Sequence, residues 1–375
     1  MGTGTAGACV MRHNLTMAKA PLKHLRRTLL LGSRRALVAG ALDRVGVLER
    51  LLWLRAKCRL PVLSVFTYHR LVALEGEGEL DRGVVEASAQ ELREQLAIIK
   101  AHCTVVSASE VRRFCSGQRR PPPNAVMISF DDGYRDNLDL ALPILQEAGV
   151  PATFFIPTSY PEAGRLFWWD RVALVIHRCQ KERAELDYPT PIALSPSRDP
   201  EAAVKRVCAA IKRTPGVDLG RLWEELERAT GVSIGADEER RLAAAAIMDW
   251  SQIRALRRAG MDVQSHSHSH RVLDTLSPEE ATRDLVTSRR VLSDALGEPV
   301  HAVAYPVGYE LRGAFRRAVA EAGFEIGFTN NSGMCLTSRV DPLNVPRVAM
   351  DRHQLGALYK LKLLIGERSP RRAAA

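Results

Sequence analysis

The 375-residue sequence lacks paired cysteines and long apolar runs. Its seven cysteines are odd in number and show no CxxC spacing, which is typical of reduced structural thiols. The apolar stretch that begins at Leu29 is interrupted by Arg34 and Arg35 before it reaches the length of a signal core or a membrane span. The sequence therefore predicts a cytoplasmic protein.

Residues 1–60 have few acidic side chains. They contain 12 Lys and Arg residues against only Asp43 and Glu49, whereas the rest of the chain holds 41 basic and 41 acidic residues. A nucleic-acid-binding protein would spread its positive charge over the folded surface, so we expect no nucleic-acid partner. Leucines recur every three or four residues over 22–54, which predicts a basic amphipathic helical arm. Two interpretations stay open: a solvated helix, or one that contacts a partner or an anionic surface at the inner membrane face.

Alternating strands and helices predict the organisation of the remaining chain. Residues 61–350 contain repeated strand–helix–strand units, which imply a parallel α/β barrel or a doubly wound sheet. Residues from about 159 to 248 break the alternation, so we expect an insertion there, and residues 351–375 are expected to be a basic tail.

Two polar segments follow predicted strands. His266, His268 and His270 follow one strand, and Asp131 and Asp132 follow another. The carboxyl ends of parallel strands meet at one mouth of a barrel, and two histidines with one carboxylate are a catalytic zinc set with an open position. Asp131 would then be a general base, which predicts a metal hydrolase. A polar surface loop and a simple Asp-Gly turn are the alternative interpretations.

Three segments resemble motifs of one family, the polysaccharide deacetylases of the NodB-homology type (carbohydrate esterase family 4). They are ISFDDG at 128–133, SHSHSH at 265–270 and AYPVG at 304–308. The resemblance covers roughly residues 61–350. Within this family, the chain is similar to bacterial exopolysaccharide-biosynthesis deacetylases. It implies a distorted (β/α) barrel, here with a helical insertion and an N-terminal helical arm.

The resemblance also implies roles for individual residues. Asp131 is the expected catalytic base, and Asp132, His266 and His270 are expected to bind a divalent metal, commonly Zn²⁺. His268 falls on a variable position of the motif. The implied reaction removes acetyl groups from an N-acetylated polysaccharide or a lipid-linked sugar.

The chain departs from the family pattern in three ways. Ala304 stands where many members have an arginine that orients the catalytic aspartate, and Val307 replaces a frequent tyrosine. No late Leu-x-x-x-His segment supplies the general acid. Rearranged members bring that histidine from the first strand, so His69 is the candidate acid; a histidine satisfied within the core is the alternative.

Five residues are expected to contact substrate. The backbone N–H groups of Gly133 and Tyr134 are candidate oxyanion donors, and Tyr305 and Pro306 lie in the third motif. Trp169 is a candidate sugar-stacking side chain, with packing in the core as the alternative. Two other functions stay open: a weakly catalytic glycan- or partner-binding protein, favoured by the missing arginine, and a metal amidohydrolase acting on a non-sugar amide.

Overall fold

The computed structural model describes residues 23–366 apart from 73–78, 309, 351 and 353–354. Among these residues, seven parallel strands close into a barrel. They are β1 (Val62–Tyr68), β5 (Ala125–Phe130), β6 (Thr153–Ile156), β9 (Asp262–Ser265), β10 (Ala302–Ala304), β11 (Ile326–Ser332) and β13 (Val345–Ala349). Their order is β1-β13-β11-β10-β9-β6-β5, and β5 pairs back to β1 from Leu63↔Ala125 to Tyr68↔Phe130. The prediction of a distorted (β/α) barrel is confirmed.

The barrel strands are apolar along most of their length because both of their faces are covered. All six residues of β5 are buried, and the rings of Phe130 and Phe154 stack with their centroids 5.0 Å apart. The distortion includes an irregular register between β11 and β13. Shorter strands extend or flank the barrel: β4 (Thr104–Val105), β12 (Cys335–Leu336), and the pair β2 (Arg70–Val72) and β3 (Val85–Ser88).

Helices cover the outside of the barrel, and their termini follow from local sequence. Ser88 and Ser277 form capping boxes with a glutamate three residues later, which fixes the starts of two of these helices. The helices are α3 (Ala89–His102), α4 (Ala108–Cys115), α5 (Leu142–Ala148), α10 (Trp250–Arg258), α11 (Pro278–Leu296) and α12 (Gly313–Glu321).

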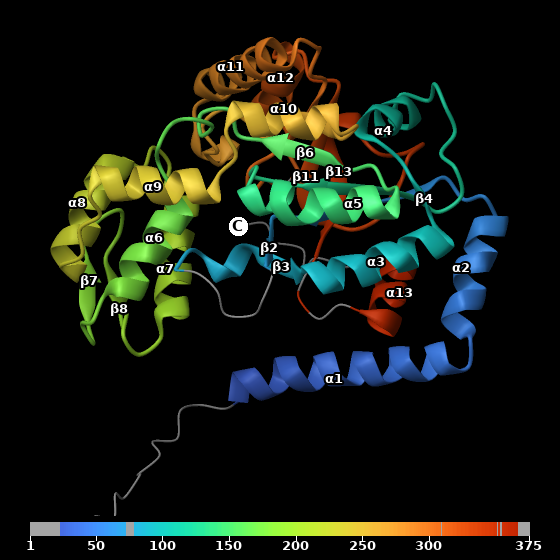
Figure 1. The fold of residues 1–375 in the computed structure, drawn as a ribbon, viewed down its shortest axis with the longest axis horizontal. Coiled ribbons are helices and arrows are strands. Elements are labelled where there is room, and N and C mark those ends of the chain that lie inside the picture. Colours follow the sequence, from blue (N-terminus) through green and yellow to red (C-terminus); the bar gives the residue numbers. More distant parts are fainter. Residues whose placement is uncertain (1–22, 73–78, 309, 351, 353–354, 367–375) are drawn as a thin grey trace, which may run out of the picture.

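The stretch expected to be an insertion lies between β6 and β9 and has an apolar core of its own, which includes Phe167, Val172 and Leu222. Figure 1 shows these elements grouped beside the barrel. They are the helices α6 (Trp168–Arg178), α7 (Pro200–Arg213), α8 (Leu219–Thr230) and α9 (Ala236–Ala246), and the antiparallel pair β7 (Ala184–Leu186) and β8 (Ile192–Leu194).

Both ends of the described chain contribute helices that pack together. The N-terminal region forms α1 (Lys23–Arg44) and α2 (Val47–Lys57), and both contact α13 (Gly356–Ile365). The assignment of 351–375 to a tail needs correction, because Tyr359 and Leu363 of α13 are buried against the barrel. Residues 1–22 and 367–375 lie outside the described residues. Within the described part of the chain, none of the helices combines the length and the apolar character that crossing a bilayer needs.

Candidate active site

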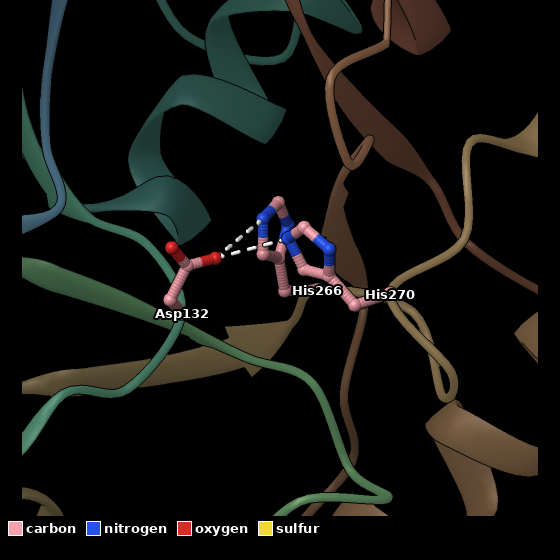
Figure 2. Close-up of side chains that lie close together, drawn as sticks. All are labelled: Asp132, His266 and His270. Carbon is pink, nitrogen blue, oxygen red and sulfur yellow. Dashed lines mark ion pairs between the residues drawn. The ribbon is translucent and has the colours of Figure 1, made fainter. Parts of the chain in front are cut away.

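Side chains from two strand ends meet at one mouth of the barrel (Figure 2). Asp132 follows β5, and His266 and His270 follow β9. One ligand atom from each of the three residues lies within 4.8 Å of the others. Asp132 Oδ1 lies 3.4 Å from His266 Nε2 and 3.0 Å from His270 Nε2, and all three side chains are buried.

The donor atoms of this cluster suit a divalent cation. His266 Nδ1 lies 2.8 Å from the Ala304 carbonyl oxygen, and donation to that oxygen leaves Nε2 as the free lone pair. Burial lowers the pKa of His270, which favours the neutral imidazole that metals bind. Two buried carboxylate oxygens, Asp131 Oδ2 and Asp132 Oδ1, accept no hydrogen bond among the described residues. Such orphaned oxygens are costly unless a cation or a substrate group satisfies them.

Unusual backbone conformations aim these side chains. Asp132, Ser267 and His270 have positive φ angles of 69°, 65° and 55°, which non-glycine residues rarely adopt. Next to Asp132, Gly133 has φ of 75°, and a Cβ there would lie 2.9 Å from Ile156 Cδ1. The histidine loop is therefore held in a strained shape that the surrounding structure must maintain.

Asp284 of α11 provides part of that support. Its carboxylate accepts the backbone N–H of His268 at 2.7 Å and that of Ser269 at 3.0 Å. The His268 ring points elsewhere, with Nδ1 2.9 Å from Thr158 Oγ1. His268 thus lies outside the cluster of Asp132, His266 and His270.

An arginine pairs with Asp131, although Ala304 stands at the position expected for one. Arg347 of β13 donates from Nη1 to Asp131 Oδ1 at 2.8 Å, and both side chains are about 1% exposed. Arg347 also donates to Thr329 O at 3.2 Å and to Asn330 Oδ1 at 2.6 Å. Burial raises the pKa of Asp131, but the Arg347 charge and the nearby histidines outweigh it and hold this pKa below its usual range. Sequence reasoning missed Arg347, for which the only signal was a cation inside the apolar run 345–350.

His69, the candidate acid, directly follows β1 and lies near Asp131. Its Nε2 is 3.9 Å from Asp131 Oδ2, and its Nδ1 is 2.9 Å from Glu86 Oε1. Glu86 of β3 also accepts the His69 backbone N–H. Burial alone would lower the pKa of His69, but the Glu86 charge and hydrogen bond, with the two aspartates, raise it to about 10. The imidazolium form of His69 is therefore the favoured one, and sequence reasoning missed Glu86 as its partner.

The residues expected to contact substrate are buried and engaged in internal contacts. Tyr134 is fully buried, and Tyr305 is too, its hydroxyl donating to Leu343 O at 2.6 Å. Pro306 is buried, and the Gly133 N–H donates to Asp131 O at 2.9 Å. These residues therefore lie in the packed layer beneath the mouth of the barrel. They are Gly133, Tyr134, Tyr305 and Pro306.

Trp169 packs against the cluster of Asp132, His266 and His270. Its ring centroid lies 4.4 Å from that of His270, and only 4% of the residue is exposed. Trp169 Nε1 donates to the Tyr134 hydroxyl at 2.6 Å, and that hydroxyl donates to Asp170 Oδ2 at 2.8 Å. The packing interpretation of Trp169 thus has geometric support, and an open sugar-stacking face does not.

Comparison with known proteins agrees with the fold and the motifs. Residues 118–187 and 222–327 match the sequence model of the polysaccharide deacetylase family, and the gap between them lies in the insertion. The Streptococcus pyogenes deacetylase PplD in complex with acetate is 17% identical, with 81% of this chain and 98% of that chain covered and a TM-score of 0.53. IcaB from Ammonifex degensii is 17% identical, with coverage of 81% and 97% and a TM-score of 0.51.

These similarities, with the order of the motifs along the barrel, define the class of protein. The chain is a (β/α) barrel of the deacetylase kind, with its polar site at the carboxyl ends of the strands. Residues 118–187 and 222–327 form a polysaccharide deacetylase domain, which matches the NodB-homology type.

Proposed function

We propose that this protein is a metal-dependent hydrolase that removes N-acetyl groups from an N-acetylated polysaccharide or a lipid-linked sugar. The observation that carries the proposal is the buried cluster of Asp132, His266 and His270 beside an unpartnered oxygen of Asp131. Three protein ligands of this type leave a coordination position open, which is typical of catalytic rather than structural zinc.

The roles of the surrounding residues follow from their contacts. Asp132, His266 and His270 would hold a divalent ion, with Zn²⁺ the best match to two imidazoles and one carboxylate, and this ion would polarise the acetyl carbonyl and activate water. Asp131 accepts the proton of the attacking water on Oδ2, because Arg347 occupies Oδ1 and keeps the carboxylate ionised.

His69 completes the reaction by giving a proton to the leaving amine. Glu86 keeps the ring protonated and orients it, while His69 Nε2 lies on the Asp131 side of the mouth. The pKa shifts of the two groups keep Asp131 ionised and His69 protonated at the same pH, so one site holds both a base and an acid for amide hydrolysis. The contact with Arg347 also removes the feature that favours a weakly catalytic binding protein, namely the lack of an arginine on Asp131.

We place the reaction in the cytoplasm. All six cysteines of the described residues are free, which suits a reducing compartment. A lipid-linked sugar would be reached at the inner face of the membrane.

Acetate release tests the proposed reaction. Purified protein reconstituted with Zn²⁺ is expected to release acetate from N-acetylglucosamine oligomers, and Asp131→Asn is expected to lower kcat by about 10³-fold while binding metal normally. The matched control is Asp139→Asn, which changes an exposed aspartate of the following helical segment and should keep full activity. Acetate release that is unchanged in Asp131→Asn would refute the enzyme hypothesis, and release from simple acetamides alone would favour the non-sugar amidohydrolase.

A further inference from the structure

The C-terminal part of α1, the whole of α2 and the residues that follow each helix concentrate exposed apolar side chains. Seven of the ten large apolar residues that are exposed among the described residues lie in residues 37–60, including Leu37 at 72% and Trp53 at 61% exposure. We call this the arm surface. Its apolar members are Leu37, Val38, Val45, Leu51, Trp53, Leu54 and Leu60.

The opposite side of the same helices is docked on the protein. Ala39, Leu48 and Leu52 are at most 1% exposed. Arg55 fastens α2 by donating to Asn124 Oδ1 and to Leu363 O, each at 2.6 Å. The arm surface is therefore the uncovered face of a firmly attached pair of helices, and Figure 1 shows α1 along the edge of the molecule, away from the barrel.

Charges on the arm are sorted between the two sides. Its two acidic residues are paired with the body of the protein: Lys360 Nζ lies 3.1 Å from Asp43 Oδ1 and 2.6 Å from Glu49 Oε1, and His102 also contacts Glu49. The exposed cations have no acidic partner among the described residues. They are Arg34, Arg35, Arg44, Arg50, Lys57 and Arg59.

We propose that the arm surface binds an anionic lipid bilayer, with α1 and α2 lying on the membrane. Exposed aliphatic and tryptophan side chains insert among headgroups, and the surrounding cations attract anionic lipids. Trp53 and Lys57 form a local example, with Lys57 Nζ 5.6 Å from the centre of the indole ring. A nucleic acid would use the cations but not the apolar side chains, and a membrane uses both. The proposal does not depend on the reaction at the barrel mouth.

Vesicle sedimentation with the full chain tests this surface. We expect binding to phosphatidylcholine vesicles that contain about 30% phosphatidylglycerol, weak binding to pure phosphatidylcholine, and release as salt rises from about 0.1 M to about 1 M. Trp53 is the most exposed tryptophan, so bound protein should show a blue-shifted emission that Trp53→Phe abolishes.

Charge and apolar variants separate the two contributions. The triple variant Arg34→Gln, Arg35→Gln, Arg50→Gln is expected to bind anionic vesicles about 100-fold more weakly. Its matched control has the same net charge and replaces exposed arginines elsewhere: Arg254→Gln, Arg258→Gln, Arg290→Gln. Leu37→Ser with Leu54→Ser should also weaken binding, whereas Val286→Ser on α11 should not.

Three results would overturn the proposal. The first is no binding of the wild type to anionic vesicles. The second is an equal loss of binding in the arm variants and their controls, which would reflect net charge alone. The third is a wild-type oligomer that light scattering shows to dissociate in the apolar variant without any vesicle binding, because a second copy of the chain would then cover the arm surface.

Discussion

The two halves of the candidate site are built in different ways. One half, which we call the metal-type half, consists of the candidate metal ligands. It takes Asp132, His266 and His270 from two short segments, each placed directly after a strand. The half that controls protons takes its partners from elements outside the motifs: Arg347 lies 216 residues from Asp131, and Glu86 lies 17 residues from His69. Local sequence thus supplies the ligands, and the closed barrel supplies the charges that fix the protonation of the base and the acid.

The difference has an energetic reason. A metal set needs donor atoms that converge, which a strand end and a tight loop supply locally. A buried base and acid need opposite pKa displacements, and each displacement requires a charge close to one group and far from the other. Arg347 and Glu86 meet that need because β13 and β3 approach the mouth of the barrel at different places.

Removing the metal-type half should have the largest effect. The double variant His266→Ala, His270→Ala is expected to lose its bound metal and all detectable acetate release, because only one carboxylate ligand remains. Elemental analysis of the purified protein checks the metal, and the acetate assay checks the activity. His268→Ala removes a neighbouring histidine outside the cluster and should keep about one metal per chain. Equal metal content in both variants would place the metal elsewhere.

Removing Arg347 should have the next largest effect. Arg347→Gln leaves the Asp131 carboxylate buried without its cation, so its pKa rises. We expect kcat to fall by about 10²-fold or more and the free energy of unfolding to fall by about 3 kcal/mol. Arg347→Lys should recover part of the kcat.

A surface ion pair is the control for the stability change. Arg112 and Glu325 lie 2.6 Å apart on the surface, and Arg112→Gln should change the free energy of unfolding by less than about 1 kcal/mol. Denaturant unfolding measures both variants. Equal small changes in the two would mean that the buried pair of Arg347 with Asp131 stabilises the fold no more than a surface ion pair does.

The same division explains what could be predicted from the sequence. The strands Val62–Tyr68 and Ala125–Phe130 are largely apolar runs ended by polar motifs, so parallel strands with Asp131 and Asp132 at a strand end follow from the sequence. Closure of these strands into a barrel, rather than a doubly wound sheet, is implied only by the family resemblance. Strand β13 could not be predicted, because Pro346 and Arg347 interrupt its apolar pattern. The buried Arg347 side chain is tolerated only because Asp131 and Asn330 accept its hydrogen bonds inside the folded barrel.

The side-chain direction of aromatic residues beside the motifs could not be predicted, for a different reason. Tyr134 and Tyr305 follow strand ends, where substrate contacts are expected, but their rings point into the protein. Tyr305 reaches Leu343 O because Gly327 leaves room: a Cβ there would lie 1.9 Å from the tyrosine hydroxyl. Side-chain direction at a turn depends on packing of this kind, which sequence spacing does not contain.

Changing the partner of His69 should shift the pH dependence rather than abolish activity. With a pKa raised to about 10, protonated His69 stabilises the fold at pH values below its ordinary pKa of about 6.5, and this contribution is lost as pH rises through 10. Glu86→Gln removes the charge that raises this pKa, so the alkaline fall in kcat/KM should move to lower pH. We expect about a tenfold loss at pH near 9 and a smaller loss near pH 6.

Imidazole NMR of the metal-free protein checks the assignment directly. The His69 signal should titrate near pH 10 in the wild type and at lower pH in Glu86→Gln. A wild-type His69 that titrates near its ordinary pKa, or a pH profile that Glu86→Gln leaves in place, would show that Glu86 does not control the acid.

The smallest effect should come from the aromatic support of His270. His266 is oriented by a hydrogen bond to Ala304 O, whereas His270 Nδ1 has no partner among the described residues and its ring rests on Trp169. Trp169→Phe keeps an aromatic ring but loses the N–H that the Tyr134 hydroxyl accepts, so metal affinity should fall only about threefold. Trp169→Ala removes the ring and should cost about tenfold or more. Competition with a zinc chelator measures both, and an unchanged affinity in Trp169→Ala would mean that Asp132 and the loop backbone alone position His270.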